Sequence, residues 1–167
     1  MTPQQRENLD KLATYLEQLP VDYKHFDMGD YYNGQALMTN EQLTDYALNN
    51  GGVDKYNCGA VACAVGHGPS AGILFKPSEI TWYNTPDWNK YSLNFIAETG
   101  NLEYQWLFGS EWEHVDNTHR DAAARIRYLL DGKPPREPAD PDYYSDDDDL
   151  FEMEAEDLRA SYAEYLV

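Results

Sequence analysis

The chain has 167 residues, enough for one domain with an appendage, and 42% of them are hydrophobic, enough for a core. Its formal net charge of -18 repels nucleic acids and anionic membranes and favours basic partners. No apolar run is long enough for a membrane span, the first residues contain no apolar signal segment, and two cysteines are too few for a disulfide scaffold, so we expect a cytoplasmic protein.

Helix-start and helix-stop signals recur along residues 1–132 and predict a mainly α fold, a compact bundle of six or seven short helices. The first signal is Thr2-Pro3-Gln4-Gln5, which combines an N-cap, a proline at the first helical position and a capping-box glutamine. Leucines at helical spacing follow it until Pro20. Further helices are predicted after Thr39, over 58–65, from Thr85 to about Ala97, from Asn101 to Phe108 and from Thr118 to Leu130. A small hairpin over 73–75 and 80–83 is the one β element that the pattern allows.

Prolines after residue 132 divide the chain into a helical body over 1–132, a Pro-rich linker over 133–145 and a C-terminal arm over 146–167. The arm is predicted to be a helix that begins within Asp146–Asp149, because acidic residues stabilise the positive end of the helix dipole. Its apolar residues recur at helical spacing and form one stripe: Phe151, Ala155, Leu158, Tyr162 and Tyr165. The arm is therefore amphipathic, with an acidic face beside an aromatic and apolar one.

Negative charge is concentrated in this arm. Residues 137–167 contain 12 of the 30 acids and a single base, Arg159. Eight of these acids fall within twelve residues: Asp146, Asp147, Asp148, Asp149, Glu152, Glu154, Glu156 and Asp157. A helix would space them at one charge per about 2.3 Å, between the values for one strand and for both strands of duplex DNA, about 3.4 Å and 1.7 Å. The arm could therefore occupy a groove built for phosphates, with Tyr143 and Tyr144 as neighbouring anchors.

Three other interpretations of the arm remain open. Blocks of like charge are often solvated tails that only improve solubility. The apolar stripe could instead dock on the body and leave the acidic face outward. A carboxylate cluster could also bind Ca²⁺, but the run at 146–149 lacks the alternating spacing and central glycine of an EF-hand loop.

The segment from Cys58 to His67 is the most distinctive local motif and has three interpretations. Cys58 at a helix N-terminus could be the nucleophile of a thiol hydrolase, with His67, His114 or His119 as its base. The two cysteines and His67 could share a zinc ion, although Gly66 is expected to end the helix before His67. Small residues in this segment could simply pack in a crowded core, and this structural interpretation fits the composition best.

Two further groups of residues could form sites. Tryptophans at 82, 88, 106 and 112 could build a ligand-binding wall, but core packing is the more frequent use of such residues. His114 lies among the acids at 111, 113 and 116 and could join an acid–base set, but a solvated loop explains that stretch more simply. We expect no cofactor and no metal.

Three segments carry a resemblance: Cys58-Gly-Ala-Val-Ala-Cys-Ala-Val-Gly-His67, Trp106-Leu-Phe-Gly-Ser-Glu-Trp112 and Asp116-Asn-Thr-His-Arg-Asp-Ala-Ala-Ala-Arg-Ile-Arg127. Residues 55–132, which include them, resemble a group of small uncharacterised phage and prophage proteins, and the acidity is similar to that of anti-CRISPR proteins. The resemblance implies a shared helical body in a bacterial host cytoplasm and no particular activity.

Together, the charge and the resemblance predict a phage-type inhibitor that is not an enzyme. It would mimic DNA and occupy the basic, nucleic-acid-binding groove of a host protein, without binding nucleic acid or membranes itself. The alternatives are a thiol hydrolase that uses Cys58, and a structural or regulatory phage protein with a solubilising tail.

Overall fold

The computed structural model describes residues 1–28, 63–81, 86–136 and 148–166. The protein is mainly helical, as predicted, and the described ranges contain no β-strand. The α-helices in these ranges are α1 (Pro3–Glu17), α3 (Trp88–Ser92), α4 (Leu102–Phe108), α5 (Trp112–Val115), α6 (His119–Leu130) and α7 (Asp148–Tyr162). Short 3-10 turns cover Val65–His67, Pro77–Glu79 and Ala163–Tyr165. None of these described helices is long and apolar enough to cross a membrane.

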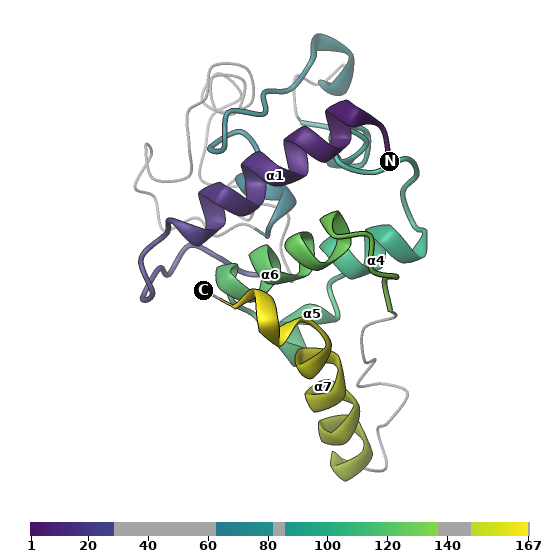
Figure 1. Ribbon diagram of the computed structural model, residues 1–167. Coiled ribbons are helices and arrows are strands. Elements are labelled where there is room, and N and C mark those ends of the chain that lie inside the picture. The colour runs from purple at the N-terminus through teal and green to yellow at the C-terminus, as the bar shows by residue number, and fades with distance from the viewer. Residues whose placement is uncertain (29–62, 82–85, 137–147, 167) are drawn as a thin grey trace.

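Helices α1 and α6 pack against each other at the centre of the body (Figure 1). The predicted capping box begins α1: the Thr2 hydroxyl accepts a hydrogen bond from the Gln5 amide, and the Gln5 side chain accepts one from the Thr2 amide. The next turns bury Leu9, Leu12 and Leu16 completely. At the rim of this pair, the Arg127 guanidinium binds the Glu17 carboxylate at 2.7 Å. Sequence signals and packing therefore agree for α1 and α6.

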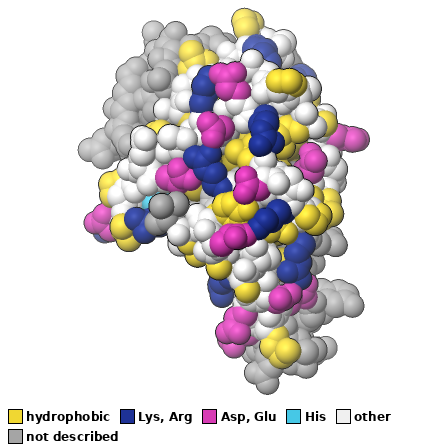
Figure 2. All heavy atoms as spheres, viewed as in Figure 1, with side chains coloured by type: hydrophobic (Ala, Val, Ile, Leu, Met, Phe, Trp, Pro, Cys, Tyr) yellow, Lys and Arg dark blue, Asp and Glu magenta, His cyan; other side chains and the backbone are white. Residues whose placement is uncertain are grey.

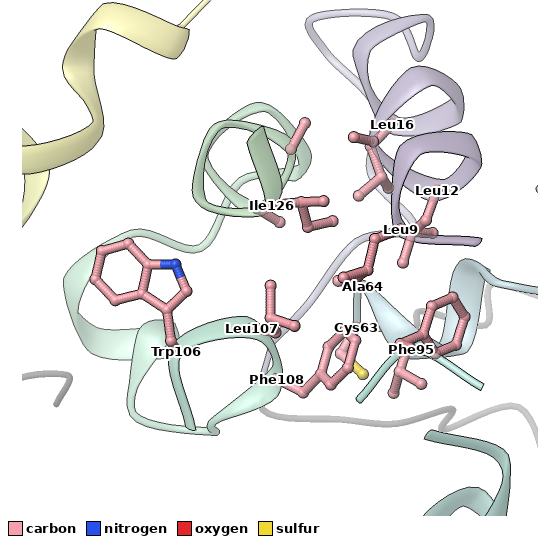
Figure 3. Close-up of a cluster of buried hydrophobic side chains, with 14 of the residues drawn as sticks. Leu9, Leu12, Leu16, Cys63, Ala64, Phe95, Trp106, Leu107, Phe108 and Ile126 are labelled. Carbon is pink, nitrogen blue, oxygen red and sulfur yellow. The ribbon is translucent and has the colours of Figure 1, made fainter. Parts of the chain in front are cut away.

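Aromatic side chains complete the core, and Figure 3 shows Phe95, Trp106 and Phe108 together with the leucines of α1. Phe75 stacks on Tyr91 with ring centroids 3.9 Å apart, and Phe95 meets the edge of Tyr91 at 5.6 Å. Gly68 lies directly against this group, because a Cβ atom at position 68 would be 2.2 Å from the Tyr91 hydroxyl oxygen. The close approach of the chain at Gly68 thus depends on the missing side chain.

Several predicted elements differ from the observed ones. The expected hairpin is not formed by its described residues: 73–75 are not in a strand, and Ile80 forms an isolated bridge with Pro86. Residues 82 and 83 of that expectation lie outside the described ranges. The helix predicted from Thr85 to about Ala97 is shorter, because Asp87 caps it and it ends at Ser92. It ends there because α1 captures the next carbonyl groups: Gln5 donates to Leu93 and Ile96, and Asn8 donates to Asn94.

Two other local expectations are corrected. Gly66 does not end its helix before His67, since the 3-10 turn runs through both residues. The acidic stretch expected as a loop contains α5, whose Trp112 and Val115 are buried in the core and hold it in place. The predicted helix after Thr39 and most of the one over 58–65 lie outside the described residues.

The packing at Gly68 gives a first prediction. Gly68→Ala should lower the free energy of unfolding by about 1–3 kcal/mol, since the new methyl group overlaps the Tyr91 hydroxyl. Tyr91→Phe should cost about 1 kcal/mol, because its hydroxyl donates to the Ile73 carbonyl. The double variant should lose clearly less than the sum, because removing the hydroxyl relieves the overlap. Urea denaturation of the four proteins measures this coupling, and strictly additive losses would contradict it.

Candidate interaction site on the C-terminal helix

The arm forms helix α7, which begins at Asp148 and therefore within the predicted start. Asp148 and Asp149 occupy its first turn, where acidic residues favour the helix dipole. The C-terminal part of α7 meets α6, whereas its N-terminal end extends away from the body (Figure 1). The contact between the C-terminal part of α7 and the body therefore determines which side chains of α7 point outward.

The apolar stripe of α7 docks on the body, as one of the sequence interpretations predicted. Ala155, Leu158 and Tyr162 are all buried, with Tyr162 completely inaccessible. The Tyr162 ring meets Trp106 and Trp112 edge-on, with centroid distances of 5.9 Å and 6.1 Å. Aromatic contacts of this kind each add about 0.5–1.5 kcal/mol beyond the burial of area. The stripe therefore anchors α7 and fixes which face points outward.

A buried arginine lies beneath this anchor. Arg125 is fully inaccessible, and its guanidinium carbon is 4.0 Å from the centroid of the Trp112 ring. Among the described residues, none of its guanidinium nitrogens has a hydrogen-bond partner. Burial lowers the pKa of Arg125, and the nearby Tyr162, Asp116 and Asp121 partly offset that effect. The positive charge is met by a cation–π contact and by two carboxyl groups.

The carboxyl group of Asp116 joins α7 to the end of α5. Its Oδ2 accepts a hydrogen bond from the Tyr162 hydroxyl at 2.9 Å and lies 3.9 Å from the Arg159 Nε. Burial, together with a hydrogen bond and repulsion from Asp121, raises the pKa of Asp116 to about 7. A proton on Asp116 relieves its repulsion from Asp121, which is the physical reason for this direction.

The outward side of α7 carries only part of the predicted acidic set. Glu152 and Glu156 are exposed, and Glu154 is half-buried. Asp157 is exposed but binds the Arg136 guanidinium at 2.7 Å. Two of the other predicted contact residues, Asp148 and Asp149, lie in the first turn of α7. The remaining ones lie outside the described residues: Tyr143, Tyr144, Asp146 and Asp147. The described core of the candidate site is therefore Glu152 and Glu156.

The cysteine–histidine segment lies elsewhere, inside the body. Cys63 and His67 are buried, as the core interpretation predicts, whereas Cys58 lies outside the described residues. His67 stacks on Phe26 with centroids 5.7 Å apart, and its Nε2 is 3.0 Å from the His25 carbonyl oxygen. In the part of the chain that the structure describes, no group of three histidine, cysteine or acidic side chains could hold a metal ion.

The other candidate bases and the tryptophans also have places in the structure. His119 is buried, with its two ring nitrogens 2.9 Å and 3.0 Å from the carbonyl oxygens of Leu16 and Pro20, whereas His114 is exposed. Trp106, Trp112 and Trp88 are all buried, so they serve the core and do not line an open wall. Trp82 lies outside the described ranges.

Sequence reasoning missed the buried cluster beneath α7. Asp121 and Arg125 are four residues apart on one helix face, and this spacing is the only signal that pointed to it. That pattern is typical of an exposed ion pair, so it gave no reason to expect a buried guanidinium.

No family model matches the chain, and no curated protein or solved structure matches it. What the site can do therefore follows from its own geometry.

The raised pKa of Asp116 predicts how stability depends on pH. The folded protein binds the Asp116 proton more tightly than the unfolded chain does, so this group lowers stability as pH rises from about 4 to about 7. Asp116→Asn should remove this component, so between pH 4 and 7 its stability should fall less, or rise more, with pH than that of the natural protein. Asp131→Asn is the matched control, because Asp131 accepts a hydrogen bond from Tyr165 in the same terminal segment. Urea denaturation between pH 4 and 8 measures the profiles, and equal slopes for the natural protein and Asp116→Asn would contradict the prediction.

Proposed function

We propose that the protein is a binding protein that inhibits a basic, nucleic-acid-binding host protein by placing the acidic face of α7 in its groove. One observation carries the proposal: the buried side chains of Ala155, Leu158 and Tyr162 anchor α7, so that Glu152 and Glu156 are presented outward from an ordered helix. A carboxylate row on an anchored helix loses little further entropy when a partner binds it.

The spacing of the exposed acids supports the mimicry of a phosphate backbone. Glu152 and Glu156 are four residues apart, which corresponds to about 6 Å along the helix axis. Successive phosphates on one DNA strand rise by about 3.4 Å. The two carboxylates therefore match alternate phosphates approximately, and lysine and arginine side chains that are arranged for phosphates can reach them.

The chain's own basic residues leave the acidic excess unneutralised. Arg136 binds Asp157, and Lys133 binds Glu164 through its ammonium group. Such exposed pairs are individually weak, at about 0–1 kcal/mol, so a partner with several basic groups can compete with them. On the face shown in Figure 2, lysine and arginine side chains lie next to acidic ones in the same way.

The docked stripe favours this function over a solubilising tail, because a tail that only adds charge needs no buried tyrosine. The thiol-hydrolase alternative gains nothing from His67, which is enclosed by the core. A phage origin and a bacterial cytoplasmic location remain part of the proposal and rest on the resemblance of residues 55–132.

The binding of a cationic probe tests the proposal. An octa-arginine peptide should bind the full chain with an affinity that falls steeply with added salt, because exposed charges are screened. The variant Glu152→Gln/Glu156→Gln should bind it about two- to thirtyfold more weakly, given about 0.2–1 kcal/mol for each of two exposed pairs. Fluorescence anisotropy measures both effects.

The matched control is a second double variant that has the same net charge as Glu152→Gln/Glu156→Gln. Glu98→Gln/Glu113→Gln removes two exposed acids from the body and should change the affinity by less than about twofold, since only distant screened charge is lost. Equal losses in the two double variants would show that net charge alone attracts the peptide, and affinity that ignores salt would refute the electrostatic contact.

A further inference from the structure

A cavity of about 190 Å³ lies where α4 ends and α5 begins. Tyr104, Gln105 and Phe108 of α4 line it, together with Ser110, Glu111 and the buried Cys63. For comparison, an apolar protein cavity of about 150 Å³ is large enough to hold benzene. The cavity can therefore accept the end of a long side chain or a small organic molecule.

One charged atom in this cavity is unsatisfied. Glu111 is partly exposed, but its Oε2 is buried and has no hydrogen-bond partner among the described residues. Leaving a buried carboxylate oxygen without a partner costs more than leaving a neutral acceptor unpaired. Among the described residues that line the cavity there is no lysine, arginine or histidine. Within the described lining, the carboxylate of Glu111 therefore has no basic partner.

Acceptor oxygens converge at one point beside Gly109. A Cβ atom at position 109 would lie 2.7 Å from the Gln105 carbonyl oxygen, 2.8 Å from Glu111 Oε2 and 2.9 Å from Gln105 Oε1. The carbonyl oxygen already accepts hydrogen bonds from the Gly109 amide and the Trp112 indole. Both side-chain oxygens therefore lie within 2.9 Å of one point, which the missing Cβ atom of Gly109 leaves unoccupied.

Aromatic rings form another part of the wall. Tyr104 and Phe108 meet edge to face with centroids 6.0 Å apart. Burial, followed by the negative charge of Glu111, raises the pKa of Tyr104, which places that carboxylate within electrostatic reach of the phenol. Aromatic faces beside a carboxylate attract organic cations, through cation–π contact on one side and charge on the other.

We propose that this cavity is a binding site for an organic cation, namely an alkylammonium or alkylguanidinium group such as the end of a lysine or arginine side chain. Glu111 would supply the charge, Gln105 a second acceptor, and Tyr104 and Phe108 the contact with the methylene groups. A divalent metal fits less well, because Ca²⁺ takes about six to eight oxygen ligands and prefers several carboxylates. The site goes beyond the proposed function, since its lining residues belong to α4, the turn after it, Met28 and Cys63, and not to α7.

An NMR titration of the full chain tests this site. n-Butylguanidinium should produce saturable shifts of the backbone amides of Tyr104, Gly109, Ser110 and Glu111. N-Butylurea, which has nearly the same shape but no charge, should bind at least about tenfold more weakly, as expected when a charged hydrogen bond is lost. This comparison needs no variant, and equal binding of the two probes would overturn the proposal.

A pair of variants locates the charge. Glu111→Gln keeps the side-chain shape and should weaken n-butylguanidinium binding about tenfold, whereas Glu113→Gln, an exposed acid on α5, should leave it unchanged. The amide spectrum itself reports whether each variant is folded. Unchanged affinity in folded Glu111→Gln would overturn the assignment.

The source of the cation follows from one more comparison. In the Glu152→Gln/Glu156→Gln background, a short peptide with a single arginine should bind more tightly than n-butylguanidinium if the natural occupant is a partner's side chain, and no more tightly if it is a small molecule. This background removes the exposed acids of α7 but leaves the cavity intact. Failure of the cavity proposal is therefore seen separately from failure of the proposed function.

Discussion

The burial of Tyr162 against Trp106 and Trp112, close to Arg125, is the contact on which the C-terminal half of the molecule depends. It joins α7 to α4, α5 and α6 through one side chain. The Tyr162 ring excludes water from the Arg125 guanidinium, which has no hydrogen-bond partner among the described residues. The contact therefore has a desolvation cost as well as a favourable free energy of packing. The gain comes from aromatic contact and buried area, and the cost comes from the desolvated cation. The free energy of docking α7 is therefore a small difference between two large contributions. Neutralising or removing any one of these side chains should change that free energy strongly.

The distribution of charge explains why this balance leaves an acidic surface. The chain contains 12 basic and 30 acidic residues, so most acids have no basic partner even if every base is paired. The bases are also used internally: Arg127 binds Glu17 at the rim of the α1–α6 pair, Arg125 is enclosed, and Arg136 holds Asp157. Each of these contacts strengthens the body or the docking of α7, and an ion pair neutralises an acid together with a base, so the net charge does not change. The negative field around the protein therefore reflects the excess of acids over bases in the sequence.

Much of the fold follows from local signals. The cap at Thr2, the helix from His119 to Leu130 and the start of α7 are set by short-range chemistry, so the sequence predicts them. The end of α3 could not be predicted in this way, because side chains some 90 positions earlier take the carbonyl groups that would have continued it. The burial of Arg125 could not be predicted either, because it depends on α7 packing over this side of α6 and not on the sequence of α6 alone. For the candidate site, the sequence indicates the amphipathic helix, and only the fold separates Glu152 and Glu156, which are exposed, from an acid that is already paired.

The two negatively charged sites, the acidic face of α7 and the cavity at Glu111, differ in their exposure to water. This difference determines what each can contribute to the binding of a basic partner. The face of α7 is exposed, so its attraction acts over about one Debye length, roughly 8 Å at physiological ionic strength, and weakens as salt is added. The Oε2 of Glu111 is buried, so its attraction is short-ranged but screened much less. An exposed row raises the rate at which a basic partner arrives, whereas a buried carboxylate slows the departure of a group that enters its cavity. A basic protein that engaged both would be steered by α7 and retained at α5. Its association rate would then depend strongly on salt, while its dissociation rate would depend on the chemistry of a single side chain.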